Sequence, residues 1–452
     1  MTRRLRGTRA ALLLLLPGIL FAQPAVKFEQ YVLDNGLTVI LHEDHSAPVA
    51  SIMMMYHVGS KNEKKGKTGF AHLFEHMMFQ GSQHVQKEEH FKLLQQVGAN
   101  VNGSTSEDRT NYFETLPSNG VELAIYLESD RMGFLLPAMD QTKLDNQRDV
   151  VKNERRQTTE NVPYGLSYET IAKALYPDTH PYSWPVIGSM ADLSAASLED
   201  VKAFFATYYA PNNACIVIAG DIDPAQVKTW VGKYFEPIPR GKVFDRPAPQ
   251  EITLKADNRL VLEDRVQLPR LYLTWPSARG YTRMDAVRDV MTDILGAGKN
   301  SRLYKSLVYE KQIAQSVTAS QDGSEIAGEL SITVTAKPGK TLTEIETAVQ
   351  QVLDDVLKNG VTEKEVQTSL NQKEASVINR QATVFGKTNG LASAFTLSGD
   401  AGNLNKELER FQGITPTEIL ADARQAFAQH KVVLSIIPQG KPDLAAQPPA
   451  SK

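Results

Sequence analysis

A weak internal repeat of helices and strands most constrains how this chain can fold. Residues 198–209 have the apolar spacing of a helix, and an apolar strand pattern follows at 214–219. In the second half, a helix predicted from Thr415 to about Ala428 precedes a similar strand pattern at 432–437. Such self-similarity is typical of a duplicated architecture. The repeat therefore predicts two similar α/β halves.

A second pair of segments supports this interpretation. The predicted strand at residues 51–58 leads into a predicted helix, as the predicted strand at 271–275 leads to the one at 284–295. A chain of 452 residues with 42% hydrophobic and 22% charged residues is long enough for two cores. The net charge of −3, without basic runs interleaved with aromatics, argues against nucleic acid as the main partner.

The boundary between the halves is predicted where proline and charge gather. We expect an N-terminal domain at 23–238, a linker at 239–250 and a C-terminal domain at 251–438. The remaining residues, 439–452, are rich in Pro and Ala and are predicted to be a disordered tail.

The main chemical signal is the stretch from His72 to His76, with Glu75 between the two histidines. The segment 68–79 is predicted to be a helix, with Thr68 capping its first amides. At 100° per residue, His72, Glu75 and His76 fall within one narrow arc. Two imidazoles four residues apart can bind one Zn²⁺, with the carboxylate beside an open coordination position. This layout predicts a catalytic metal site.

The alternative is a chance arrangement on an amphipathic helix. Given nine His and 52 acidic residues, His-x-x-acid-His arises somewhere in such a chain with a probability of roughly two in a hundred. The flanking apolar residues need no functional explanation, because apolar residues at helical spacing are usually core. They are Leu73, Phe74, Met77, Met78 and Phe79.

A third ligand cannot be chosen by spacing alone. His72-x-x-Glu75-His76, followed by the run that ends at Glu154, resembles the pitrilysin/insulinase family of zinc peptidases with an inverted motif. The resemblance implies one Zn²⁺ per chain, Glu154 as the third ligand and Glu75 as the catalytic base. It also places Gln147 where many relatives carry a glutamate that supports the ligands. Without the resemblance, Glu154 would be an ordinary solvated carboxylate on a helix at 143–161.

The resemblance extends to two further segments. Residues 31–41 are two β-rich runs around Asn-Gly, which predicts a hairpin and matches the opening of the family. Residues 102–113 resemble the exposed strand edge that receives the substrate backbone, which implies substrate-binding roles for Asn102 and Gly103. Most relatives carry alanine at the position of Gly103. A surface turn is the alternative for this segment.

The family implies an α+β fold: two homologous α/β-sandwich halves, each a mostly antiparallel sheet packed with helices, that form half of a clamshell. Its chamber favours short or unfolded peptides. Eight of the nine histidines precede residue 200 and the other is His430, so the zinc chemistry is assigned to the first half.

The second half departs from the family at two positions. Relatives carry an Arg and a Tyr there, seven residues apart, which reach towards the substrate. This chain has Val308 and Gln315 instead, and neither Arg302 nor Tyr309 has the spacing to replace them. The departure resembles members that divide the work between two chains. It implies a heterodimer with a homologous subunit that supplies the Arg/Tyr pair.

The N-terminus has the pattern of a signal peptide. Basic residues between Arg3 and Arg9 precede an apolar run at 10–21, and Ala22 offers a small residue for cleavage. A periplasmic or secreted protein is therefore predicted from residues 1–22. An uncleaved membrane anchor is the alternative, although the apolar run is short for a span. The single Cys215 lies in an apolar strand pattern and is interpreted as core.

These observations predict a zinc-dependent endopeptidase that is the catalytic subunit of a heterodimer. A catalytically silent assembly subunit remains an alternative because the Arg/Tyr pair is missing. A protein that only binds zinc or peptides is a second alternative, but such a site needs no carboxylate between its histidines.

Overall fold

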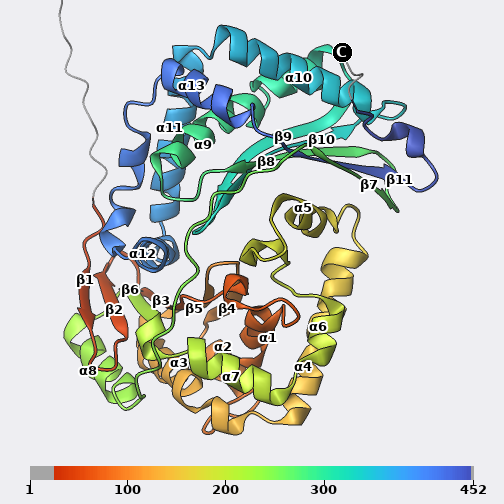
Figure 1. Cartoon of the computed structure of the whole chain (residues 1–452). Helices are drawn as coiled ribbons and strands as arrows, with labels where there is room; N and C mark the ends of the chain where they lie inside the picture. The colour runs from red at the N-terminus through yellow and green to blue at the C-terminus, as the bar shows by residue number, and fades with distance from the viewer. Residues whose placement is uncertain (1–24, 449–452) are drawn as a thin grey trace, which may run out of the picture.

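The computed structural model describes residues 25–448, which form two α/β units that face each other (Figure 1). We call residues 25–238 the first half and residues 251–448 the second half. The predicted signal peptide at 1–22 lies outside the described residues. Within 25–448, no helix has both the length and the apolar character needed to cross a membrane.

The first half contains a six-stranded sheet in the order β1-β2-β6-β3-β5-β4. Its strands are β1 (Glu29–Val32), β2 (Thr38–Glu43), β3 (Val49–Tyr56), β4 (Asn100–Thr105), β5 (Thr110–Pro117) and β6 (Ala214–Gly220). The predicted hairpin is confirmed by β1 and β2, which pair antiparallel. Gly36 in their turn has φ +93°, a conformation that favours glycine.

The second half repeats this order without the outermost strand, as β7-β11-β8-β10-β9. Its strands are β7 (Asn258–Asp264), β8 (Arg270–Ser277), β9 (Ala314–Gly323), β10 (Gly328–Ala336) and β11 (Val432–Pro438). Each sheet has one parallel pair, β2 with β6 and β7 with β11, and antiparallel pairs otherwise. The predicted α+β fold with two similar, mostly antiparallel halves is confirmed.

Thirteen α-helices lie in the described part of the chain. Those of the first half are α1 (Phe70–Met77), α2 (Glu89–Gln96), α3 (Val121–Phe134), α4 (Gln141–Arg155), α5 (Ser167–Leu175), α6 (Met190–Ala195), α7 (Leu198–Tyr208) and α8 (Pro224–Phe235). Those of the second half are α9 (Arg283–Gly296), α10 (Leu342–Asn359), α11 (Glu363–Gln381), α12 (Val384–Ser398) and α13 (Pro416–Ala426).

Each half covers one face of its own sheet. Alternate residues of β3, such as Ile52 and Met54, pack with α1, α3, α7 and α8 in the core of the first half. Leu271, Leu273 and Trp275 of β8 pack with α9, α10 and α13 in the core of the second half. The period of two along a strand leaves the other face of each sheet to be covered separately.

The two halves cover these remaining faces for each other. Helix α12 of the second half packs on β3 and β6, where Leu391 joins Met53, Met55 and Cys215 in one buried cluster. Helix α5 of the first half packs on β8 and β11, and its Ile171 is buried with residues of the second sheet. Figure 1 shows α5 beneath the second sheet and α12 beside the first. The exchange explains why the halves form one packed unit.

The ends of the second half differ from the sequence prediction. The segment expected to be disordered from residue 439 is ordered as far as it is described, so this prediction is wrong for 439–448. Ala445 and Ala446 are buried in the second core, and the amide of Ala446 donates to Ser435 Oγ at 3.1 Å. The small alanine side chains fit into this part of the second core. Composition alone did not reveal that the core has room for them.

The exchanged helices predict a measurable stability effect. Replacing the fully buried Leu391 by Ala should lower the free energy of unfolding by about 2–5 kcal/mol, because it leaves a cavity between α12 and the first sheet. Ile378→Ala on the neighbouring α11, where the side chain is 45% exposed, is the control and should cost much less. Urea denaturation measures both. Equal losses would contradict the packing of α12 described above.

Candidate metal centre

Helix α1 separates an apolar face from a polar one. Phe70, Leu73, Phe74 and Met77 are buried in the first core, while His72, Glu75 and His76 are only partly buried on the opposite side. The core interpretation of the flanking apolar residues Leu73, Phe74, Met77 and Met78 is confirmed.

The start of α1 differs from the prediction that Thr68 caps it. The cap residue is Gly69, with φ +88°, and no side chain of its own caps the helix. Thr68 instead donates through its hydroxyl and amide to Asp192. The capping prediction is therefore wrong, since a more distant group occupies the site.

That group is the carboxylate of Glu63. Its oxygens accept from the amides of Gly69 at 2.9 Å and Ala71 at 2.8 Å. Burial raises the pKa of Glu63. The hydrogen bonds from these backbone N–H groups act in the opposite direction, because they favour the ionised form. A carboxylate at a helix N-terminus also interacts favourably with the helix dipole. Glu63 lies in the loop before the helix, where no local capping pattern indicates it.

Helix α4 brings Glu154 to the two histidines. Its Oε2 lies 3.1 Å from His76 Nε2, and its Oε1 lies 3.7 Å from His72 Nε2. One ligand atom from each of the three residues lies within 4.8 Å of the others. In the sequence, 77 residues separate His76 from Glu154. The packing of α1 against α4 joins them.

These atoms fit a metal ion. In a tetrahedral zinc site with bonds of about 2.1 Å, neighbouring ligand atoms are about 3.4 Å apart. The separations of 3.7 Å and 3.1 Å, each measured to a different oxygen of Glu154, lie on either side of that value. Two imidazoles and one carboxylate are also a common protein ligand set for catalytic zinc.

The protonation of the ligands suits this role. Burial, and then the neighbouring His76, lowers the pKa of His72 to about 4, so its imidazole is neutral at pH 7. The hydrogen bond from His76 lowers the pKa of Glu154. A neutral imidazole and an ionised carboxylate are the forms that bind a metal.

Glu75 lies beside these ligands and is held by one hydrogen bond. Thr105 Oγ1 at the end of β4 donates to Glu75 Oε2 at 2.6 Å. Burial raises the pKa of Glu75, and the hydrogen bond from Thr105 opposes that shift. Sequence reasoning gave Thr105 no role, although it lies in the segment that resembles the family.

Strand β4 passes alongside the same carboxylate. It is an edge strand that pairs only with β5 among the described strands. A Cβ added at Gly103 would lie 3.3 Å from Glu75 Cγ, so this position approaches the site closely. Asn102 is exposed and accepts the amide of Gly103 at 2.8 Å. Both predicted substrate-binding residues therefore lie on an edge next to Glu75.

Gln147 is on α4 as predicted, but its hydrogen bond goes elsewhere. It is 5% exposed and donates to Asn146 Oδ1 at 3.1 Å. His72 Nδ1 is buried and has no hydrogen-bond partner in the described structure. A ligand histidine is usually oriented through this second nitrogen. Gln147 therefore does not orient His72 by a hydrogen bond here.

The residues at and near the predicted Arg/Tyr positions make no described contact with the metal ligands. Val308 packs against the second core, and Gln315 is exposed on β9. Arg302 donates to Glu365 at 2.8 Å and to Asp355 at 3.1 Å, both in its own half. The side chain of Tyr309 is largely exposed. Neither Arg302 nor Tyr309 is brought to the metal ligands by any of these contacts.

Comparison with known families agrees with this geometry. Residues 38–180 match the family described as insulinase, peptidase family M16, and residues 195–373 match the peptidase M16 inactive domain. The chain belongs to peptidase family M16, the pitrilysin/insulinase family. The first of these matches contains His72, Glu75, His76 and Glu154, while the inactive-domain match falls mostly on the second half.

Similar M16 proteins span nearly the whole chain. The zinc protease PqqE of Helicobacter pylori is 27% identical over 431 residues, which cover 94% of this chain and 96% of that protein. An uncharacterized zinc protease of Bacillus subtilis, YmxG, is 23% identical over 91% of this chain and 98% of its own length. Both names support a family that contains zinc proteases.

Solved structures show the same architecture. A protease from Helicobacter pylori superposes with a TM-score of 0.85 at 25% identity, over 92% of this chain and all of that one. The first half of the periplasmic protease PqqL from Escherichia coli gives a TM-score of 0.77 at 19% identity, over 94% of this chain and 95% of that one. Full-length PqqL is matched over only 50% of its length. This M16 chain thus has the size of one PqqL half.

The metal centre predicts which carboxylate of α4 matters for zinc. Glu154→Gln should weaken zinc binding by more than the roughly 10- to 100-fold typical of lost outer partners, because it removes a direct ligand. Asp149→Asn on the same helix, whose side chain is 77% exposed, is the matched control and should leave zinc affinity unchanged. Competition with a zinc-binding dye measures both constants. Equal affinities for the two variants would contradict the site.

The cap of α1 predicts a second effect. Glu63→Ala should lower the free energy of unfolding by about 1–3 kcal/mol, since it leaves buried amides without partners. It should also weaken zinc binding, because α1 carries two of the three ligands. Glu199→Ala, which removes an exposed acid in the first turn of α7, is the control. Thermal unfolding with and without zinc measures both effects, and a loss no larger than that of the control would contradict the capping role.

Proposed function

We propose that this M16 protein is a zinc-dependent endopeptidase, with His72, His76 and Glu154 as zinc ligands and Glu75 as the catalytic base. The observation that carries the proposal is the convergence of the three ligand atoms beside the partly buried carboxylate of Glu75. Relatives named zinc proteases support it. A site that only stores zinc has no use for the carboxylate of Glu75 beside the three ligands.

Glu75 is arranged to accept a proton. Thr105 occupies its Oε2, which leaves Oε1 free to take the proton of a water and pass it to the leaving amine. Burial raises the pKa of this carboxyl, which makes it a stronger base than an exposed glutamate. Bound zinc would supply a water of lowered pKa and would polarise the scissile carbonyl.

The free edge of β4 is the proposed binding surface for the substrate. An extended peptide that pairs with this edge gains main-chain hydrogen bonds whatever its sequence. Asn102 and Gly103 then lie under the peptide, next to Glu75. Short or unfolded peptides are the substrates that can adopt this extended form.

A second chain completes the proposed enzyme. Val308 and Gln315 provide neither the guanidinium nor the phenol that stabilises a developing oxyanion in relatives. The match to one half of PqqL supports an assembly of two such units. We propose a homologous subunit as the source of the Arg/Tyr pair, in a heterodimer in the periplasm or outside the cell, reached through the predicted signal peptide at 1–22.

A silent assembly subunit is the second candidate. The missing Arg/Tyr pair favours it, whereas the converging ligands and Glu75 favour the peptidase.

Glu75→Gln tests the proposal directly. The variant should bind one zinc per chain with unchanged affinity and lose nearly all cleavage of a fluorescence-quenched peptide library, because the amide cannot accept the proton. The assay compares the zinc-loaded chain alone with the chain plus a homologous subunit that carries Arg and Tyr. Glu88→Gln makes the same chemical change at an exposed position before α2 and is the control, which should keep full cleavage.

Three outcomes are informative. Cleavage that needs both chains and Glu75 supports the full proposal. Cleavage by this chain alone refutes the need for a partner. Zinc binding without cleavage in either assay refutes the peptidase and supports the silent subunit.

A further inference from the structure

A short 3₁₀ helix, η1 (Ser60–Asn62), anchors the end of strand β4. The amides of Ser60 and Lys61 donate to the carbonyl oxygens of Ser106 and Glu107, at 3.2 Å and 3.0 Å. A Cβ at Gly59 would collide with this turn, so glycine permits the close approach. We call residues 106–109 the β4–β5 turn. It directly follows Thr105, the residue that holds Glu75.

The same short helix η1 is followed by the residue that caps α1. Glu63, which follows η1 directly, caps the N-terminus of the helix that carries Glu75. One segment therefore fixes both sides of the Thr105–Glu75 contact. A shift of η1 relative to the β4–β5 turn would move the hydroxyl and the carboxylate apart.

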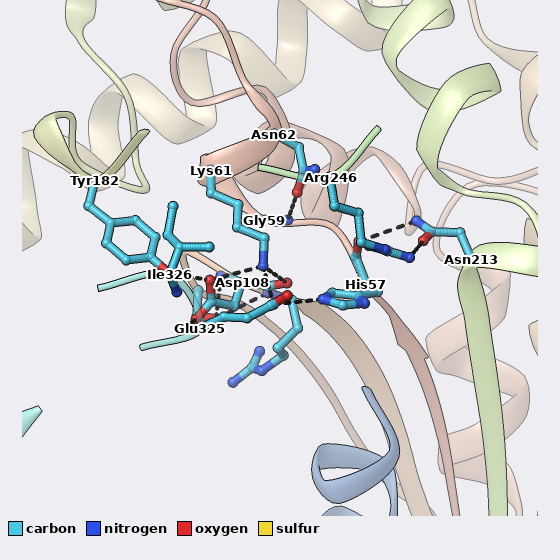
Figure 2. A network of polar contacts seen from close by, with 12 residues as sticks. His57, Gly59, Lys61, Asn62, Asp108, Tyr182, Asn213, Arg246, Glu325 and Ile326 are labelled. Carbon is cyan, nitrogen blue, oxygen red and sulfur yellow. Dashed lines mark hydrogen bonds and ion pairs between the residues drawn. The ribbon is translucent and has the colours of Figure 1, made fainter. Parts of the chain in front are cut away.

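A buried polar network from the second half holds this segment (Figure 2). Lys61 has a fully buried side chain, and its Nζ donates to Asp108 Oδ1 at 3.0 Å and to Glu325 Oε2. Glu325, in the turn between β9 and β10, also lies 2.7 Å from His57 Nε2. The amide of Glu325 donates to Asp108 Oδ2 at 2.9 Å.

A tyrosine hydroxyl closes the network. Tyr182 donates to Asp108 Oδ1 at 2.5 Å and accepts the amide of Ile326 at 3.2 Å. Figure 2 shows Tyr182, Lys61 and His57 around the carboxylates of Asp108 and Glu325. The turn of the second half is thereby bonded through both backbone and side chain to the β4–β5 turn.

The buried charges fix the relative positions of Lys61, Asp108 and Glu325. An ammonium group without exposure requires its carboxylate partners, and loss of one partner leaves an uncompensated charge. Asp108 and Glu325 are the two partners of Lys61. Burial would raise the pKa of Glu325, but His57 and Lys61 lower it to about 2, so this carboxylate stays ionised. Removing its charge should loosen η1 and the β4–β5 turn together.

We propose that Glu325 is a positioning residue of the peptidase centre, which acts through Lys61 and Asp108 on the β4–β5 turn that follows Thr105. The inference rests on the proposed function of Glu75. It gives the second half a part in the centre although that half lacks the Arg/Tyr pair. The contacts of Lys61, Asp108 and Glu325 described above include none of the zinc ligands, so the direct effect is on the Thr105–Glu75 contact.

The test compares two ion pairs between the halves. Glu325→Gln removes the charge in the network and keeps its shape. Lys387→Gln removes the pair of Lys387 with Asp44, whose atoms are 2.5 Å apart. The Lys387 side chain is 20% exposed, close to the 18% of Glu325, and the pair joins α12 to the loop after β2 without touching η1 or the β4–β5 turn. Peptide cleavage is measured in the active form of the enzyme, either the chain alone or with its partner.

We expect kcat of Glu325→Gln to fall by as much as about 100-fold, as for a catalytic group displaced by about 1 Å. KM and zinc stoichiometry should stay near those of the unmodified protein, and Lys387→Gln should keep its kcat. In a Thr105→Val background, Glu325→Gln should have little further effect, because both changes act on one contact. A merely structural role would give additive losses in kcat.

Hydrogen exchange provides a readout that does not depend on activity. Amides at 104–110 should exchange faster in Glu325→Gln than in Lys387→Gln. If Glu325→Gln does not fold, Tyr182→Phe removes one bond of the network and keeps the charges, and it should show the same changes on a smaller scale.

The outcomes separate the two proposals. If the unmodified protein cleaves no peptide, either alone or with its partner, the proposed function is refuted. The hydrogen-exchange data then test on their own whether Glu325 holds the β4–β5 turn in place. An active enzyme in which Glu325→Gln and Lys387→Gln behave alike in kcat and in exchange overturns the role of Glu325. Additive effects with Thr105→Val overturn it as well.

Discussion

The need to bury both faces of each sheet determines how this molecule is built. Each sheet has two apolar faces, and the helices of its own half pack on only one of these faces. Helix α12 covers the free face of the first sheet, and α5 covers that of the second. Neither half can bury its own sheet without the other. The exchange brings the β9–β10 turn against the loops of the first half, so the polar network around Lys61 follows from the apolar packing.

The candidate centre depends on this arrangement at two levels. Helices α1 and α4 bring two histidines and a glutamate together, and the amphipathic pattern of α1 alone places Glu75 beside them. The orientation of Glu75 needs more, namely the hydroxyl of Thr105 and the segment from Gly59 to Glu63. A metal site can thus be complete in its ligands while its base still depends on contacts between the halves.

Sequence predicted what local periodicity controls. The helices and strands of the repeat, the β1–β2 hairpin and the apolar face of α1 follow from spacing along the chain. Glu154 required resemblance to a family, because no local pattern links it to α1. The cap by Glu63 and the pairing of Lys61 with Glu325, 264 residues away, were missed, because they arise only when distant segments pack. The ordered segment 439–448 was missed since composition does not show the small site that Ala445 and Ala446 fill.

The proposed activity depends on one zinc site formed by His72, His76 and Glu154 beside Glu75. X-ray absorption at the zinc edge, on the chain loaded with one equivalent of zinc, tests it most directly. We expect a shell of two imidazole nitrogens and carboxylate or water oxygens at about 2.0–2.2 Å, and loss of one imidazole in His76→Ala. A zinc shell of oxygens only, or one unchanged by His76→Ala, would contradict it.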